Sequence, residues 1–595
     1  MSVRIGRAVG RLIAYRKGLY AANTVSWIVI LLLELGAGYA AKLFFDALTG
    51  SAPMGFTVTG VIALVLGIGL VRVAAMLAGA LLDIRHRFTM EVLLWGNLLR
   101  GILDQPGARS IPGSTGEALN TFRDDTMVVE DLLSWLIDQA AMVCYVAVAL
   151  VILVRIDARI TAIAVLPLLG VLLAARVVSK HIRRFREAAR DTTERVAGAI
   201  GETMEGVETL QLAGAGEHAA AYVERLNRAR LRAAVKDRLL SQSFHSFFWN
   251  AASLCTGLIL LAAAGGLRAG TFSVGDFALF VIYVGVLTEF IAATGDFMIH
   301  FKQAGVSLRR MAKLIRDPDG ARVTAHTPVH LRGPLPKAGR PALRDDERLR
   351  SMLVRGLSYR WPGDEAPCGR FELRDVALDV ARGEFVVVTG RIGSGKTTLL
   401  RAILGLLPAT EGEIRWNGQR VVRPDRFLVP PRCAYTPQVP QLFSESLREN
   451  ILMGLEAADV DLASALRLAV LDQDVPQLQD GLETVVGAKG VKLSGGQRQR
   501  AAAARMFVRE PELLVFDDLS SALDVETEAL LWERLSGETS RTCLVVSHRR
   551  PALQRADRIV LLRDGQVDAV GRLEELLEVS EEMRCLWRGT LTDAA

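Results

Sequence analysis

The sequence has few cysteines, and they carry no metal-binding pattern. Its six cysteines are scattered over 595 residues, and no two have the close spacing of a zinc site. We expect reduced thiols without a disulfide framework. Long basic tracts are also missing, because 71 Lys and Arg stand against 65 Asp and Glu, a net charge of +6. So mild an excess does not predict a nucleic-acid partner.

Charged residues are scarce overall, and this scarcity indicates a membrane protein. Only 23% of the residues are charged, 50% are hydrophobic, and the mean hydropathy is +0.27. The chain is too apolar for an ordinary soluble protein and too charged to lie wholly in lipid. It is also too long for one compact core. These values predict a membrane part joined to a soluble part.

Six apolar runs in the first half are long enough to cross a bilayer. Each has about the 20 residues that a hydrocarbon core roughly 30 Å thick requires. Buried helices of a soluble bundle are the alternative, but such helices are usually shorter and have a polar face. The runs are Tyr20–Phe45, Val58–Leu82, Leu132–Val154, Ile160–Val178, Phe247–Ala269 and Phe277–Phe297.

Charge placement orients these spans. The N-terminus and the segment after the fourth span are rich in Lys and Arg, whereas the connections on the other side are short and almost uncharged. The positive-inside rule therefore places both termini and the long connections in the cytoplasm. These connections have helical periodicity. We expect helices that extend beyond the membrane, with turns at Ser114–Thr126 and Glu202–Glu217.

Acidic residues inside the spans are costly and often face a cavity or a partner. Glu34 lies in the first run and Glu289 in the last, with Asp296 about two turns further on. We hypothesise that Glu34 and Glu289 line a transport path and favour cationic or amphipathic cargo. The alternative is that Glu289 and Asp296 lie near a membrane–water interface and are solvated.

A proline-rich stretch divides the chain. Residues Asp317–Leu349 contain five prolines among Gly and Arg, a composition typical of a linker. We therefore predict a transmembrane domain at 1–315, a linker at 316–350 and a third segment at 351–595. The last segment alternates short β-rich runs with helical stretches, as in an α/β domain.

The most specific motif is a phosphate-binding loop in that segment. In "GEFVVVTGRIGSGKTTLL" the strand Phe385–Thr389 precedes a helix from Thr398, and Gly390–Thr397 fits G-x-x-x-x-G-K-[ST]. Backbone N–H groups of such a loop surround a phosphate chain, its lysine reaches the terminal phosphates, and its hydroxyl binds Mg²⁺. The candidate nucleotide ligands are Gly390, Arg391, Ile392, Gly393, Ser394, Gly395, Lys396, Thr397 and Thr398.

Two adjacent carboxylates end a second apolar run, "PELLVFDD". Behind a phosphate loop, Asp517 is placed to hold Mg²⁺ directly or through water. The next residue, Asp518, is then in position to act on the attacking water.

At this point the sequence resembles the ATP-binding cassette (ABC) family over about 200 residues. "LSGGQRQR" matches the family signature, and the six spans resemble the membrane half of an exporter-type half-transporter. "YTPQ" places Gln438 at the glutamine-loop position, "SSALD" contains Asp524, "VVSHRR" places His548 at the switch-histidine position, and "LSYRWPG" places Trp361 where the family stacks a ring on adenine.

The resemblance implies a dimer mechanism. Two cassettes would enclose ATP between the phosphate loop of one chain and Ser494, Gly495, Gly496 and Gln497 of its partner. Gln438 would contact the metal or water, and His548 would contact the γ-phosphate. Closure on ATP and opening after hydrolysis would then switch the side of the membrane that the cavity faces.

Two positions depart from the family pattern. The family has glutamate where this chain has Asp518, and an acidic residue where it has Ala488. Aspartate is shorter by one methylene, and a displacement of about 1 Å can cost roughly 10²-fold in rate. This favours a heterodimer in which a different partner carries the faster site. The alternative is a slow homodimer in which Asp518 acts through a water.

We therefore expect an ATP-hydrolysing pump that exports a small or amphipathic molecule. It would need ATP, Mg²⁺, a second half-transporter and a lipid bilayer. Its location would be the plasma membrane, because abundant Ala, Arg, Gly and Leu suggest a GC-rich bacterium. The alternatives are an importer on the same fold and an ATP-binding regulator or gate that seldom hydrolyses ATP.

Overall fold

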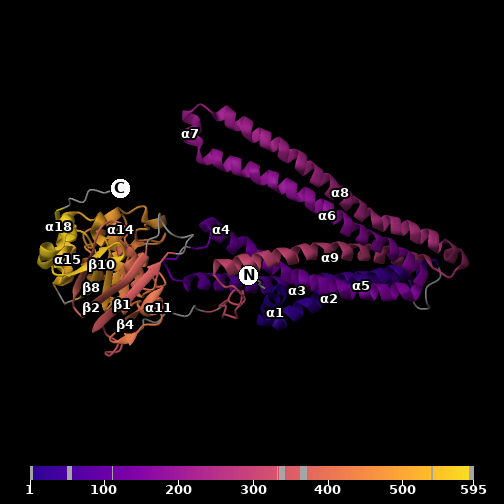
Figure 1. Cartoon of the computed structure of the whole chain (residues 1–595). Coiled ribbons are helices and arrows are strands. Elements are labelled where there is room, and N and C mark those ends of the chain that lie inside the picture. Colours follow the sequence, from indigo (N-terminus) through magenta and orange to yellow (C-terminus); the bar gives the residue numbers. More distant parts are fainter. Residues whose placement is uncertain are drawn as a thin grey trace. The chain divides into compact units, whose positions relative to one another are not determined.

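The structure, a computed structural model, divides into two compact units (Figure 1). Unit 1 comprises Met1–Gly101 and Pro112–Leu331, and unit 2 comprises Ile102–Ile111 and Arg332–Ala595. The described residues are 4–49, 57–109, 111–331, 333, 342–361, 372–537 and 541–588. Cys368 and the linker prolines Pro334, Pro336 and Pro341 lie outside them.

The regular elements of unit 1 in the described residues are all helices. Its long helices α6 and α8 run side by side and are joined by the short helix α7 (Figure 1). The elements are α1 (Ile5–Tyr15), α2 (Lys17–Leu48), α3 (Val58–Leu103), α4 (Thr115–Asn120), a π-helical turn (Thr121–Asp125), α5 (Thr126–Ile156), α6 (Ala158–Glu205), α7 (Val207–Leu212), α8 (Gly216–Ala269) and α9 (Val274–Leu314).

Four helical stretches in the described part of the chain are long and apolar enough to cross a membrane. They are Lys17–Leu48, Val58–Leu103, Thr115–Ile156 and Val274–Leu314. Helices α6 and α8 contain the shorter apolar stretches Ala158–Pro167 and Ser253–Ala269. Six long helices therefore coincide with the six expected spans, while a count of six membrane crossings stays a prediction.

The turn expected at Ser114–Thr126 was wrongly placed. These residues form α4, the π-helical turn and the start of α5. Ser114 caps α4 by accepting a hydrogen bond from the backbone N–H of Glu117 through Oγ, as serine commonly does at a helix start. The break in helical structure lies earlier, between Leu103 and Ser114, where Pro106 and Pro112 cannot continue a helix.

The second expected turn, Glu202–Glu217, contains the end of α6, helix α7 and the start of α8. Residues 316–331, which open the expected linker, pack within unit 1. Asn97 Nδ2 donates to the carbonyl oxygens of Val323 and Ala325, both at 2.9 Å, and its Oδ1 accepts from Thr327 Oγ1 at 2.7 Å. A buried amide on α3 therefore holds this segment.

Unit 2 is an α/β unit built on two sheets (Figure 1), which confirms the fold class. One sheet has the strand order β2-β1-β4-β5 and the other has β10-β9-β3-β8-β7-β6. The strands are β1 (Ser351–Arg360), β2 (Glu372–Ala381), β3 (Phe385–Thr389), β4 (Glu411–Trp416), β5 (Gln419–Arg420), β6 (Cys433–Thr436), β7 (Leu513–Asp517), β8 (Thr542–Val546), β9 (Arg558–Arg563) and β10 (Gln566–Gly571).

Helices surround these sheets. The α-helices are α10 (Lys396–Ile403), α11 (Pro424–Phe427), α12 (Leu447–Leu452), α13 (Leu462–Leu468), α14 (Gly495–Phe507), α15 (Val525–Ser536), α16 (Arg550–Arg555), α17 (Leu573–Val579) and α18 (Glu581–Arg588). Short 3₁₀ turns lie at Ala457–Asp459, Val475–Gln477, Gly481–Glu483, Ala488–Gly490 and Leu519–Ala522.

The register of the larger sheet positions the candidate site. Strands β3, β6, β7 and β8 are parallel neighbours, with Val388 beside Val546 and Asp517 also beside Val546. The loops that follow β3, β7 and β8 therefore leave the sheet at one edge. Parallel sheets bind ligands at the carboxyl ends of their strands, so this edge is where the predicted motifs meet.

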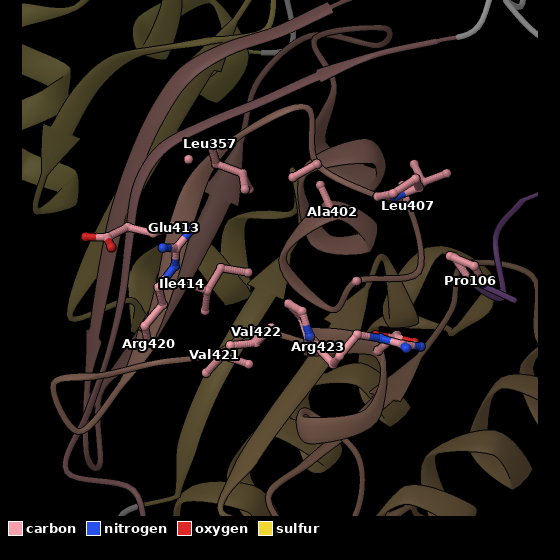
Figure 2. Close-up of a pocket in the computed structure, with 16 residues that line it drawn as sticks. Pro106, Leu357, Ala402, Leu407, Glu413, Ile414, Arg420, Val421, Val422 and Arg423 are labelled. Atoms are coloured by element: carbon pink, nitrogen blue, oxygen red, sulfur yellow. The ribbon is translucent and has the colours of Figure 1, made fainter. Parts of the chain in front are cut away.

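The segment Ile102–Ile111 packs against the strands and helices of unit 2. Ala108 N donates to Leu406 O at 3.1 Å, and Arg426 forms an ion pair with Asp104 at 2.6 Å. Figure 2 shows Pro106 of this segment at a pocket of about 650 Å³ whose other labelled residues include Leu407 and Arg423. The chain that leaves α3 is thus held beside the loop after α10.

Candidate ATP-binding site

The phosphate loop connects β3 to α10, as the sequence predicts. Its first residue, Gly390, has φ of 147°, where only glycine is comfortable. A Cβ on Gly390 would lie 2.1 Å from Leu562 O and 2.8 Å from Ser394 Oγ. Close packing on β9 therefore requires glycine here, independently of any nucleotide.

Lys396 points into the loop that precedes it. Its Nζ donates to Gly390 O at 2.9 Å and to Arg391 O at 2.7 Å. Burial lowers the pKa of Lys396, and the charges of Asp518 and Asp517 oppose this shift. An ammonium group held only by neutral carbonyls in a partly buried site is well suited to a phosphate anion.

Thr397 and Asp517 provide oxygen ligands that fit Mg²⁺. Thr397 Oγ1 donates to Asp517 Oδ1 at 3.0 Å, and Tyr435 OH donates to Oδ2 at 3.1 Å. Asp517 is 0% exposed, and burial raises its pKa. Mg²⁺ is commonly held by one or two protein oxygens together with water and substrate phosphates. When bound here, it would neutralise the buried carboxylate and the phosphate charge.

Asp518 occupies the turn directly after β7. Its backbone is left-handed, with φ of 51°, and its N–H donates to Val546 O at 3.0 Å. Gln438 Nε2 donates to Oδ2 over 3.4 Å, a long hydrogen bond. Oδ1 is buried with no partner among the described residues. Burial raises the pKa of Asp518, and the charge of His548 opposes this shift.

These groups line one cavity of about 630 Å³. It combines the phosphate loop with residues that follow β1, β6, β7 and β8. Ser394 Oγ is buried with no partner among the described residues, so the phosphate loop has an unused hydrogen-bonding group. The lining residues are Trp361, Ile392, Gly393, Gly395, Lys396, Thr397, Thr398, Gln438, Asp517, Asp518, Val546 and His548.

The residues Ser494–Gln497 do not line that cavity. They begin α14 with a capping box, in which Ser494 Oγ accepts from Gln497 N at 3.2 Å and Gln497 Oε1 accepts from Ser494 N at 3.0 Å. A Cβ on Gly496 would lie 2.8 Å from Ala522 O, so close packing on the 519–522 turn requires glycine. Within one chain, this motif and the phosphate loop are therefore separate parts.

Two family profiles match the sequence. The profile described as "ABC transporter transmembrane region" matches residues 22–290, and the profile described as "ABC transporter" matches residues 373–521. The chain belongs to the ABC transporter family.

Relatives of this ABC transporter extend over most of its length. A probable multidrug resistance ABC transporter ATP-binding/permease protein of Bacillus subtilis is 26% identical over 94% of each chain. An ATP-dependent lipid A-core flippase of Cupriavidus metallidurans is 31% identical over 69% of this chain and 66% of the flippase. A bacterial Atm1-family ABC exporter with ATP bound has the same fold, with a TM-score of 0.76, 21% identity, and coverage of 97% of this chain and 100% of that one.

Family membership establishes the general activity: this ABC transporter couples ATP hydrolysis to transport across a membrane. In the described cavity, Lys396 and the loop N–H groups would bind phosphate. Asp517 and Thr397 would hold Mg²⁺, while Asp518 and Gln438 would position water near the terminal phosphate.

Asp524 and Gln499 lie outside the residues that line the cavity of this ABC transporter. Asp524 caps α15 by accepting from Thr527 N at 2.9 Å and from Thr527 Oγ1 at 2.8 Å, so its carboxylate already has a structural partner. Gln499 was not predicted as a site residue. Its Nε2 donates to Gln438 O at 3.3 Å and its Oε1 accepts from Ala522 N at 3.2 Å. Gln499 lies within the signature motif, which was the available signal.

Proposed function

We propose that this ABC transporter is one half of a dimer whose own phosphate-loop site hydrolyses ATP slowly. Its partner would be a different half-transporter that carries the faster site. The complex would export a small or amphipathic molecule across the cytoplasmic membrane, with the termini and unit 2 in the cytoplasm. The observation that supports this proposal most directly is the position of Asp518.

The geometry around Asp518 supports slow hydrolysis. The residue is 9% exposed, one carboxylate oxygen has no partner among the described residues, and the other is 3.4 Å from Gln438 Nε2. A carboxylate that is withdrawn by about 1 Å from the water it should orient can lose roughly 10²-fold in rate. This argument concerns the rate of hydrolysis and not ATP binding, because the hydrogen bonds of Lys396 are to Gly390 and Arg391 and that of Thr397 is to Asp517.

The separation of the signature from the cavity supports the dimer. Ser494–Gln497 form a helix start with their own hydrogen bonds but do not line the cavity. A helix N-terminus is a favourable place for a phosphate, so a second chain could dock its nucleotide there. This chain would then complete the partner's site even when its own site is slow.

The experiment compares Asp518→Asn and Asp518→Glu in the complex purified from the native membrane through a tag on this chain. We expect a second half-transporter to co-purify and Asp518→Asn to leave steady-state ATPase activity within about 2-fold, because the partner's site dominates turnover. Asp480→Asn, an exposed aspartate outside the cavity, is the matched control. A collapse of activity in Asp518→Asn alone would refute the slow site.

If the transporter is instead a homodimer, the same preparation should give a different result. Only one polypeptide would then be recovered, and Asp518→Glu would raise turnover because the longer side chain reaches the attacking water. The direction of transport is tested by substrate flux in inside-out vesicles, where an exporter accumulates cargo and an importer does not.

The charges inside unit 1 bear on the choice of cargo. The Glu34 carboxylate forms an ion pair with Arg72 on α3, so its charge is compensated. Glu289 is exposed in unit 1. We therefore assign the preference for cationic cargo to Glu289. Transport of a cationic dye should fall in Glu289→Gln and persist in Asp296→Asn, since Asp296 lies at the very end of the apolar run Phe277–Phe297.

A further inference from the structure

The C-terminal helix α18 contacts the phosphate loop. Arg391 Nε donates to Glu582 Oε1 at 2.5 Å, and Arg391 NH2 donates to Oε2 at 2.7 Å. This is a two-point contact between a guanidinium group and a carboxylate, the most directional form of ion pair. The residues are 191 positions apart, so the contact joins the second residue of the loop to the far end of the chain.

The two side chains of this pair differ in burial. The Glu582 side chain is 6% exposed, whereas that of Arg391 is 53% exposed. Separating a buried carboxylate from its cation is costly. The ion pair with Glu582 therefore keeps the Arg391 side chain in place even though that side chain is half exposed. Neutralising Glu582 removes the buried charge and leaves a guanidinium group that water can solvate. Such a change releases the loop with little penalty to folding.

Arg391 also contacts the lysine of the loop. Its carbonyl oxygen accepts from Lys396 Nζ at 2.7 Å. The Glu582 carboxylate, the Arg391 side chain, the Arg391 backbone and the Lys396 ammonium group therefore form one continuous series of contacts. Movement of the Arg391 backbone would displace the ammonium group that binds phosphate.

The same helix reaches a second loop of the site. Arg550 NH2 donates to the carbonyl oxygen of Trp587 at 2.9 Å, and the Arg550 guanidinium carbon lies 5.1 Å from the centre of the Trp587 ring. Arg550 follows His548 by two residues and begins α16. Helix α18 thus contacts the loops after both β3 and β8.

Helix α18 is itself firmly attached. Met583 is buried in the larger hydrophobic core of unit 2 together with Leu576 of α17. Ser580 Oγ accepts from Met583 N at 3.2 Å, and Arg584 donates to the carbonyl oxygens of Leu577 and Glu578 at the end of α17. An element anchored in the core can restrain a loop that is otherwise held by backbone contacts.

We propose that α18 braces the ATP site and that Glu582 is a positioning residue, which holds the phosphate loop in its nucleotide-binding conformation through Arg391. Glu582 lies outside the residues that line the cavity, so it acts through Arg391 and not on ATP. The brace contributes to nucleotide affinity because a restrained loop loses less conformational freedom when it binds. The chemical step depends on Asp518, Gln438 and His548, which the brace does not contact.

The test measures ATP binding and hydrolysis by the full-length transporter complex in lipid nanodiscs, using a fluorescent ATP analogue for binding. At this chain's own site, Glu582→Gln should raise the Kd for ATP and the ATP concentration that half-saturates single-turnover hydrolysis roughly 3- to 10-fold, as expected for a half-exposed ion pair, and leave the maximal single-turnover rate within about 2-fold. Glu582→Asp keeps the charge, and its Kd for ATP should lie between those of the wild type and of Glu582→Gln. Glu581→Gln is the matched control, because its exposed side chain is on the same helix.

A double-mutant cycle separates positioning from general stability. In the Arg391→Gln background, Glu582→Gln should cause no further loss of affinity, because their contact is already broken. The proposal is overturned if Glu582→Gln binds ATP as the wild type does, or if its loss of affinity is undiminished without Arg391. It is also overturned if Glu582→Asp, with unchanged thermal stability, slows single-turnover hydrolysis at this chain's own site without weakening ATP binding there.

Discussion

Gly390 offers the sharpest test of how unit 2 is packed at the phosphate loop. In Gly390→Ala the new methyl group would lie 2.1 Å from the backbone carbonyl oxygen of Leu562, and the residue would keep φ of 147°. A Cβ essentially never approaches another heavy atom within 3.0 Å, and Leu562 lies in the interior strand β9, paired on both sides. The loop must therefore move away from β9 or the strand must shift.

The expected loss of stability is obtained by comparison with a glycine that has a positive φ but no neighbour that a Cβ would contact. Gly418 has φ of 83°, and a Cβ there would meet nothing within 4 Å. Gly418→Ala should cost about 1–2 kcal/mol, the left-handed penalty alone. Gly390→Ala adds overpacking of about 1–3 kcal/mol. The excess of Gly390→Ala over Gly418→Ala is therefore roughly 2 kcal/mol, or about 4–8 °C in the melting temperature of a unit this large.

The assay is thermal unfolding of the nucleotide-free, full-length protein, followed by tryptophan fluorescence. ATP binding is measured in parallel, since Gly390→Ala should lose affinity and Gly418→Ala should not. Gly393→Ala is a further comparison: its Cβ also meets nothing within 4 Å, but Gly393 lines the cavity. It should melt like Gly418→Ala and still bind ATP poorly. Equal melting temperatures for Gly390→Ala and Gly418→Ala would refute the packing argument.

Two predictions concern other parts of the chain. Asn97→Ala leaves two carbonyl groups and a hydroxyl group without their buried partner, so it should destabilise unit 1 by roughly 2–4 kcal/mol, measured as a lower melting temperature than that of the exposed control Asn250→Ala. Because burial raises the pKa of Asp518 above its ordinary 3.8, single-turnover hydrolysis at this chain's own site should fall with acid at a higher pH than an ordinary aspartate would give, and Asp518→Asn should remove this dependence.

Sequence patterns predicted the parts of the site whose residues are close together in the chain. Strand β3 and the phosphate loop were placed correctly, and Asp517 ends its strand as expected, because an apolar strand followed by a glycine-rich loop has few other structures. The Arg391–Glu582 pair could not be predicted in this way. Its two residues are 191 positions apart, and a single glutamate on a short helix has no pattern that identifies its partner.

The error at Ser114–Thr126 has a related cause. Its polar composition is typical of a turn, but the same Ser and Glu spacing also caps a helix start, and the structure uses it as a cap. Most of the residues that turn the chain lie in the segment Ile102–Ile111, which belongs to unit 2 through contacts such as Ala108 with Leu406. A contact between two distant backbone groups does not change the composition or the hydrophobic periodicity of either segment, so the sequence pattern could not predict it.

Helix α10 gives unit 2 a short connection between the nucleotide and the segment 102–111. Its first turn carries Lys396 and Thr397, and Leu406, three residues after its end, accepts the hydrogen bond of Ala108. Eight residues of helix span only about 12 Å and behave as a stiff rod over that distance. A displacement of the phosphate loop is therefore passed to Leu406 with little loss, and the chain continues from that segment directly into α3.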